Sequence, residues 1–163
     1  MRRNSAALVI LVAGSLLLIA ILTIAGPKPQ VEKKGAADVT VVIDFGGQRP
    51  AHPYGNSTVA WWEDGSVDPS PGPALWSLVL KMDNATVYSA LEAASKRADF
   101  TFTADWYPNF RSHRVNEIAG VRDGADNRYW QYYMNGQYLD KGADLVGLSD
   151  GDTVRWEFKA AQQ

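Results

Sequence analysis

The chain contains no cysteine and only two histidines among its 163 residues. The absence of cysteine excludes a disulfide framework, thiolate chemistry and a lipoprotein-type cysteine anchor. His52 and His113 lie in polar segments flanked by proline or arginine, and no third ligand type stands close to either in the sequence. Because a zinc site or a histidine-based active site needs several convergent groups, the sequence favours neither.

Excess basic charge is also absent. The chain has 16 Lys and Arg against 18 Asp and Glu, and Arg2 and Arg3 precede an apolar run, so the remainder is more acidic still. Phosphate binding needs a basic field, which argues against a nucleic-acid partner. Ser57 in YGNST lacks the second glycine of a nucleophile elbow, and no glycine-rich phosphate loop is present. We therefore expect no catalytic residue, no cofactor and no enzymatic activity.

A long apolar run follows Arg3. Residues 4–27 carry no charged side chain, and about 20 apolar residues are enough to cross the hydrocarbon core of a bilayer. We expect residues 1–26 to form an N-terminal transmembrane anchor in the cell membrane, with a cytoplasmic N-terminus and the remaining domain outside. The alternative is a signal peptide with a small-residue cleavage site near Ala25, which would leave a secreted protein.

The rest of the chain divides into a linker and one domain. Residues 27–38 are rich in Pro, Lys and Gly, which is typical of a linker. Within the predicted domain, residues 39–160, apolar side chains alternate in a segment that starts at Val39, in residues 75–82 and in residues 100–106. This period of two predicts strands. Residues 115–121 form a weaker strand candidate.

One soluble helix is predicted over residues 86–97. Val87, Ala90, Leu91 and Ala94 recur at the spacing of one helical face, and Asn84 or Thr86 can cap the first amides. One helix packed on a mixed sheet forms a two-layer α+β domain.

Residues 46–74 are the least regular segment. Gly, Pro, Ser and Asp dominate them, and a loop of this length in a small domain is usually functional or an insertion. A two-layer domain leaves one face of its sheet uncovered. We expect residues 46–74 to fold over that face.

The C-terminal third predicts a hairpin and a last strand. Asn135-Gly136 lies between two aromatic-rich arms, and this dipeptide favours a type I′ turn. A two-residue loop pairs Met134 with Gln137 and Tyr133 with Tyr138. The alternation then puts Trp130 and Tyr132 on one face of the sheet and Tyr133 and Tyr138 on the other.

These motifs together resemble a known family. TVYSALEAAS at 86–95, WQYYMNG at 130–136, GAD at 142–144, LSDGD at 148–152 and WEF at 156–158 are similar to the transcobalamin C-terminal-like domain of the soluble-ligand-binding β-grasp group. The resemblance implies a β-grasp-like fold and an extracytoplasmic setting. In transcobalamin such a domain closes over cobalamin held by a large helical barrel, for which this chain has no room. A corrinoid-like ligand would be held by the small domain alone or with a partner.

Exposed aromatic side chains are the main candidates for a binding surface. They would stack on a sugar, a corrinoid or a peptide; the alternative is that the long loop packs on them as a second small core. The predicted ligand-binding residues are Trp61, Trp62, Trp106, Tyr107, Tyr133 and Tyr138.

The remaining polar motifs are weaker. RDGADN offers Asp123, Asp126 and Asn127 to a hard cation, but its spacing does not match an EF-hand loop, so we predict no metal site. Asn56 and Asn84 begin glycosylation sequons, although Thr86 can instead serve as a helix cap.

The functional prediction is a membrane-anchored, extracytoplasmic, non-catalytic binding module for a small molecule or a surface polymer such as a glycan. The alternative is an interaction or structural module of the cell envelope with a protein partner. An enzyme would need two carboxylates, from Asp44, Glu63 or Asp105, paired in one cleft.

Overall fold

The computed structural model describes residues 36–161, all within the second of two compact units of the chain, residues 34–163. The predicted anchor, residues 1–26, lies outside the described residues. Within residues 36–161, no helix has the length and apolar character needed to cross a membrane.

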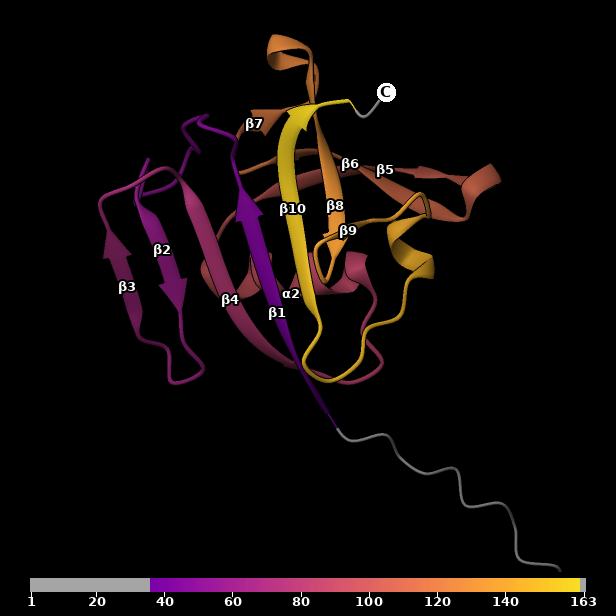
Figure 1. Cartoon of the computed structure of the whole chain (residues 1–163), viewed down its shortest axis with the longest axis horizontal. Helices are drawn as coiled ribbons and strands as arrows, with labels where there is room; N and C mark the ends of the chain where they lie inside the picture. The colour runs from indigo at the N-terminus through magenta and orange to yellow at the C-terminus, as the bar shows by residue number, and fades with distance from the viewer. Residues whose placement is uncertain (1–35, 162–163) are drawn as a thin grey trace, which may run out of the picture. The chain divides into compact units, whose positions relative to one another are not determined.

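A seven-stranded mixed sheet forms the centre of this unit (Figure 1). β1 pairs in parallel with β10 and antiparallel with β4, and β2 pairs in parallel with β4. In spatial order the strands are β3 (Val67–Ser70), β2 (Thr58–Trp61), β4 (Leu75–Met82), β1 (Ala37–Asp44), β10 (Thr153–Ala160), β8 (Arg128–Met134) and β9 (Gln137–Tyr138).

Alternation along these strands makes one face of the sheet the core. Val39, Val41 and Ile43 of β1 are fully buried, as are Val154 and Phe158 of β10, and Trp156 between these last two is 3% exposed. The alternate residues Thr40, Val42, Arg155 and Glu157 are partly exposed. We call this buried face the inner face and the opposite one the outer face. The predicted period of two is confirmed for β1, β4 and β10, and β4 has the predicted bounds.

The helix α2 (Val87–Ala98) packs on the inner face. Thr86 caps it through a reciprocal pair of hydrogen bonds with Ser89, whose backbone N–H donates to Thr86 Oγ1 at 3.2 Å while Thr86 N–H donates to Ser89 Oγ at 2.8 Å. Asp99 ends the helix in the left-handed conformation, at φ 54°. The predicted helix, its buried stripe and its cap are confirmed, so the domain has the predicted α+β class.

A second, three-stranded sheet lies beside the helix, behind the seven-stranded sheet in Figure 1. It consists of β5 (Phe102–Tyr107), β6 (Ser112–Ile118) and β7 (Val121–Arg122). Sequence analysis took residues 115–121 as one strand, but Ala119 and Gly120 both have positive φ, at 47° and 80°, and turn the chain between β6 and β7. The short helical turns η1 (Pro108–Phe110), η2 (Ala125–Asn127) and η3 (Ala143–Leu145) complete the fold.

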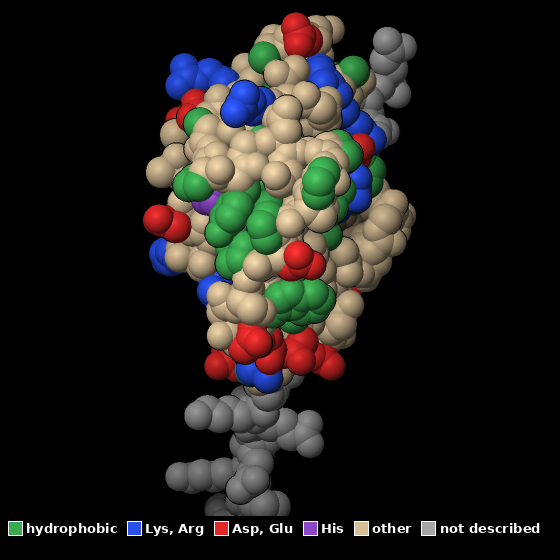
Figure 2. All heavy atoms as spheres, turned by 90° about the vertical axis from the view of Figure 1, so that its left-hand side faces the viewer, with side chains coloured by type: hydrophobic (Ala, Val, Ile, Leu, Met, Phe, Trp, Pro, Cys, Tyr) green, Lys and Arg blue, Asp and Glu red, His purple; other side chains and the backbone are tan. Residues whose placement is uncertain are grey.

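The expectation for residues 46–74 is wrong. β2 and β3 lie within this segment and extend the seven-stranded sheet at its edge, so these strands lie in the sheet instead of covering its outer face. The preceding residues pack toward the helix, since the His52 ring nitrogen Nε2 lies 3.1 Å from the Ala98 carbonyl oxygen. Figure 2 looks onto the β3 side, where apolar side chains gather in the middle and acidic ones lie below them.

Candidate ligand-binding cavity

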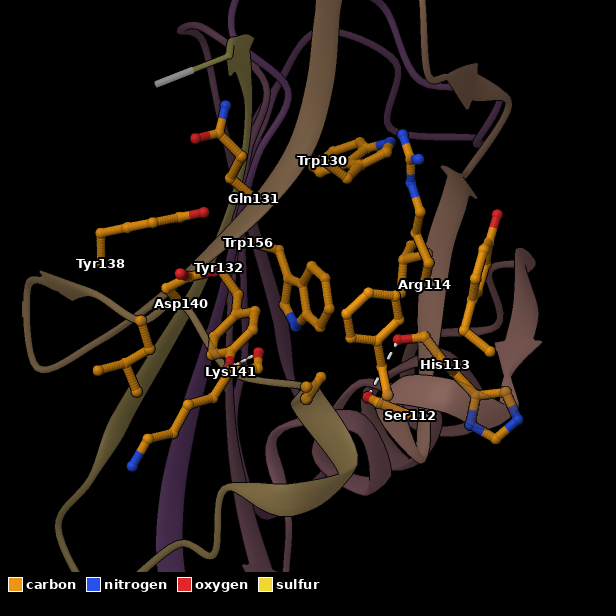
Figure 3. Close-up of a pocket in the computed structure, with 16 residues that line it drawn as sticks. Ser112, His113, Arg114, Trp130, Gln131, Tyr132, Tyr138, Asp140, Lys141 and Trp156 are labelled. Carbon is orange, nitrogen blue, oxygen red and sulfur yellow. Dashed lines mark hydrogen bonds between the residues drawn. The ribbon is translucent and has the colours of Figure 1, made fainter. Parts of the chain in front are cut away.

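A cavity of about 520 Å³ lies between β6, β8 and residues 139–143, the segment that follows β9 (Figure 3). This volume falls within the range of about 300–1,000 Å³ that is typical of small-molecule sites. The lining is dominated by aromatic rings, which belong to Tyr107, Phe110, Trp130, Tyr132, Tyr138 and Trp156.

Strand register explains why three of these rings meet. Trp130 and Tyr132 are two residues apart on β8, so both point to the inner face. Trp156 stands directly opposite Tyr132 on β10, and the centroids of their two rings are 5.5 Å apart. The cavity therefore continues the aromatic core of the domain to an opening at the edge of the sheet.

The buried polar atoms of two of these rings have partners. The Tyr132 hydroxyl donates to the Lys141 carbonyl oxygen at 2.6 Å, and the Trp130 indole N–H donates to the Val121 carbonyl oxygen at 2.9 Å. Burial, together with the neighbouring Tyr138 and Asp140, raises the pKa of Tyr132 to about 12. The Tyr132 hydroxyl therefore stays protonated at neutral pH and fixes Lys141 beside the cavity.

The polar atom of the Trp156 ring, unlike those of Trp130 and Tyr132, lacks a hydrogen-bond partner in the described part of the chain. The Trp156 side chain lines the cavity and the residue is only 3% exposed, yet its indole N–H has no hydrogen-bond partner among residues 36–161. Most buried polar groups in proteins are hydrogen-bonded, and an unpaired one incurs the desolvation cost of that group, about 1–3 kcal/mol. The Trp156 N–H is therefore an unpaired, buried donor in the wall of the cavity.

A network around Asp144 fixes one side of the cavity. The Asp144 carboxylate accepts hydrogen bonds from the Ser112 hydroxyl at 2.9 Å and from the His113 backbone N–H at 2.7 Å, and its other oxygen lies 3.0 Å from His113 Nδ1. Burial alone would raise the pKa of Asp144, but the hydrogen bonds from His113 and Ser112 outweigh it and lower that pKa. The Ser112 hydroxyl is thus directed to a carboxylate and not to an imidazole, and the network ties η3 to β6.

Gly142 allows η3 to approach β6 this closely. A Cβ atom at this position would lie 2.6 Å from Ser112 Oγ and closer still to Ser112 Cβ. Charged side chains stand around the opening: Arg114 pairs with Asp123 at 3.0 Å, and Asp140 and Lys141 are exposed.

The structure brings two of the six predicted ligand-binding residues together at the cavity, Tyr107 and Tyr138. Tyr133 lies on the outer face next to Tyr138, with ring centroids 5.7 Å apart and the Lys159 ammonium 4.5 Å from the Tyr133 centroid. Trp106 is half exposed on β5 beside His113.

The other two predicted residues lie on β2 or directly after it. Trp61 is buried in the main core of the domain and packs against His52, Tyr54 and Trp76, so it is not an exposed stacking residue. Trp62 is 52% exposed and stands apart from the cavity residues in the sequence and in the fold.

Sequence reasoning missed four of the aromatic cavity residues, Phe110, Trp130, Tyr132 and Trp156. It placed Trp130 and Tyr132 together on one face of the hairpin but did not predict a cavity there. Phe110 is 70% exposed, in the turn η1 between β5 and β6, and a residue in such a turn has no periodicity by which to place it. The alternation of apolar residues along β10 predicts correctly that Trp156 is a core residue. Only its pairing with Tyr132 of β8 shows that its ring lies at the cavity.

The acidic candidates are engaged with backbone groups or other side chains of the domain. Asp123 accepts from the Trp130 backbone N–H at 2.7 Å, and Asp126 accepts from Gln48 at 3.1 Å. Asp44 pairs with Arg155, Glu63 lies 3.9 Å from Lys81, and Asp105 accepts from Asn116. Among the described residues, no group of three or more His, Asp and Glu side chains is placed to hold a metal ion. Asn56 and Asn84 of the sequons are exposed.

Comparison with known proteins gives one family match. Residues 84–160 match the model of a domain of unknown function, DUF4430. This region runs from the residues before α2 to the end of β10, so it contains every residue that lines the cavity. No curated protein matches the chain.

Two similar solved structures are a protein of Ruminococcus gnavus ATCC 29149, described as a candidate metal-binding protein, and haptocorrin in complex with Cbi. The first is 12% identical with a TM-score of 0.47, over 77% of this chain and 99% of that chain. Haptocorrin is 17% identical with a TM-score of 0.46, over 78% of this chain but only 26% of its own length.

Proposed function

We propose that this protein is a non-catalytic binding module whose ligand occupies the cavity between β6, β8 and residues 139–143. The observation that carries the proposal is a cavity of about 520 Å³ lined by six aromatic rings, in whose wall the buried Trp156 indole N–H has no partner among residues 36–161. The rings supply apolar contact area that favours binding, and an acceptor atom of a ligand would satisfy the Trp156 donor after a local shift of the lining.

The lining favours a ligand with a flat or apolar part and at least one acceptor oxygen. A sugar ring or a corrinoid-like molecule has both, which agrees with the resemblance of the C-terminal motifs to transcobalamin C-terminal-like domains and with a β-grasp-like domain. Tyr107 and Tyr138 are each about 40% exposed at the opening, where they can contact the part of the ligand that remains outside.

The site is tested by titrating the full-length chain, labelled with ¹⁵N at tryptophan, with cobinamide and with a set of oligosaccharides. We expect at least one probe to shift the Trp156 indole N–H resonance and to raise the melting temperature. Tyr107→Ala and Tyr138→Ala should each weaken that binding about tenfold, because truncating an aromatic contact costs on the order of 1–2 kcal/mol.

Trp62→Ala is the matched control, since Trp62 is an exposed aromatic residue that does not line the cavity. It should leave the affinity unchanged. The proposal is refuted if no probe moves the Trp156 resonance, or if Trp62→Ala weakens binding as much as Tyr138→Ala.

We further propose that residues 1–26 anchor the module in the cell membrane, with the domain on the outer side. The apolar run of residues 4–27 supports this. Deletion of residues 1–26 should move the protein from the membrane fraction to the soluble fraction. Recovery of a mature chain that begins near Gly26 would instead establish the secreted form.

A further inference from the structure

β5 is the longest strand at a sheet edge in the part of the chain that the structure describes. It lies at one end of the three-stranded sheet, has six residues and pairs with β6 alone. The other edge strands, β3, β7 and β9, have four, two and two residues. β3 also contains Asp68 and Pro69, and a charge or a proline on an edge opposes the addition of another strand. β5 contains no proline, and Asp105 is its single charged residue.

A hydrogen bond at the start of β5 fixes the direction in which its backbone groups point. The Ala119 N–H donates to the Thr101 carbonyl oxygen at 2.8 Å. The neighbouring residues Phe102 and Ile118 therefore form a non-hydrogen-bonded pair of the antiparallel ladder. In such a pair the N–H and C=O groups of each residue point away from the other strand. Those of Phe102 thus point away from β6, to the open edge of the sheet.

The bulge in this ladder lies on β6 and leaves β5 regular. The register skips Asn116, so the extra residue belongs to β6. Because backbone groups alternate along a regular strand, the N–H and C=O groups of Ala104 and Trp106 point to the same edge as those of Phe102. Among residues 36–161, these three N–H and three C=O groups have no hydrogen-bond partner. The edge of β5 is therefore free to pair with another strand.

The side chains at this edge are apolar and in part exposed. Phe102 packs on Tyr88 of α2, with ring centroids 5.9 Å apart, and Ala104 packs against the core. Trp106 lies on the same face of β5 but is 51% exposed, and its ring centroid is 4.9 Å from that of His113. An open strand edge with an exposed aromatic ring is a surface at which strands of other chains pair.

We propose that two copies of this chain associate through β5, with the two strands antiparallel and related by a twofold axis at Ala104. The two Ala104 residues are then directly opposite one another, and Phe102 of each copy is opposite Trp106 of the second copy. All three N–H and three C=O groups of each edge are paired in this register, and the two three-stranded sheets become one continuous sheet. The inference does not depend on the proposed function, because Phe102, Ala104 and Trp106 do not line the cavity.

The side chains of β5 complement those of a second β5 in this register. Trp106 is placed beside Phe102 of the second copy, and aromatic cross-strand pairs stabilise a sheet. The twofold axis repeats this contact, so both Trp106 rings lose exposed surface. Asp105 is opposite Thr103 of the second copy, so no like charges are directly opposed. A second copy therefore fits this edge better than a sugar or a lipid, neither of which offers N–H and C=O groups at strand spacing.

Single-cysteine variants of the full-length chain test the register, because the chain has no cysteine of its own. Directly opposite residues of a hydrogen-bonded antiparallel pair have Cα atoms about 5.5 Å apart, within the range that a disulfide spans. Ala104→Cys should therefore form a disulfide-linked dimer under mild oxidation with copper phenanthroline. Thr101→Cys, at an exposed position opposite residue 107 of the second copy, is the matched control, because its two copies would lie about 20 Å apart. We expect Ala104→Cys to cross-link about tenfold faster than this control, or more.

A second pair of variants, made in the Ala104→Cys chain, tests the aromatic contact. Trp106→Ala should slow cross-linking by about tenfold, because it removes both copies of the contact with Phe102. Trp62→Ala removes an equally exposed indole outside β5 and should change the rate by less than about twofold.

The inference is overturned if Ala104→Cys and Thr101→Cys cross-link at the same rate, as association through another surface would produce, or if neither cross-links. Equal effects of Trp106→Ala and Trp62→Ala would also overturn it.

Discussion

Replacement of Gly142 by alanine tests whether the close contact between η3 and β6 holds the cavity in shape. Gly142 has φ −63° and ψ 134°, which alanine adopts without strain, so the effect of the substitution is steric. The new Cβ would overlap Ser112, a residue only 3% exposed whose hydroxyl donates to Asp144. A displacement of Ser112 away from the new Cβ would disrupt that hydrogen bond.

Two terms set the expected cost. Insertion of a methyl group into a packed site costs about 1–3 kcal/mol, and loss of a buried hydrogen bond costs about 1 kcal/mol. We expect Gly142→Ala to lower the free energy of unfolding by about 2–4 kcal/mol. With a urea m-value near 2 kcal/mol/M, the midpoint would fall by roughly 1–2 M.

Equilibrium urea denaturation, followed by tryptophan fluorescence, measures this shift. Gly147→Ala is the matched control, because a Cβ at Gly147 meets no atom within 4 Å. It should leave stability unchanged or raise it by about 0.4–1 kcal/mol, since alanine restricts the unfolded chain. The reasoning is wrong if the two variants unfold at the same urea concentration.

Three further predictions concern single residues. Asp144→Asn should reduce the loss of stability that the protein shows as the pH falls. The pKa of Asp144 in the folded protein lies below its ordinary value of 3.8. The Asp144 carboxylate therefore stabilises the folded state above pH 3.8, and this contribution is lost as the pH falls through the folded pKa. Urea midpoints of wild type and variant should therefore differ most near neutral pH and converge toward pH 2. Thr86→Ala should destabilise the domain by about 1 kcal/mol through loss of the α2 cap, whereas Thr101→Ala, which removes an exposed side chain, should stay within about 0.5 kcal/mol. Gly136→Ala should cost about 1–2 kcal/mol, because φ is 80° there, and a thermal melt with an unchanged midpoint would contradict the type I′ turn.

Local patterns in the sequence are enough to predict the elements whose signals are strong. Asn135 and Gly136 have positive φ and close a hairpin with the predicted pairs, and Thr86 caps the helix with the predicted buried stripe. In both elements the turn or cap chemistry and the apolar periodicity indicate the same structure. When local turn or cap chemistry and apolar periodicity agree in this way, the structure of a segment can be predicted without knowing which segments it packs against.

The strands β2 and β3 could not be predicted in this way. Each has four residues, and Pro69 lies within β3, which is tolerated because β3 is the edge strand of the sheet. β2 is paired with β4 on one side and with β3 on the other, and β3 is paired with β2 alone. The segment therefore looks like a loop until its neighbour is known.

The cavity depends on the same kind of long-range information. A count of aromatic residues identified a surplus, but it could not tell Trp61, which faces the core, from Tyr138, which stands at the cavity. Which face a side chain takes follows from strand register, and register is a property of two segments. Phe110 and Trp156 meet in this cavity although they are distant in the sequence.

The place of β10 in the sheet also affects how the protein is made. β10 follows the other described strands in the sequence, yet it lies between β1 and β8 in the sheet. Its residue Val154 pairs with Val41 of β1. During synthesis the β1 edge stays unpaired until residues 153–160 have left the ribosome, and long-range pairing of this kind folds slowly. A nascent chain arrested before Thr153 would therefore present exposed apolar strands to chaperones and proteases, and a truncation that removes β10 would affect the centre of the domain.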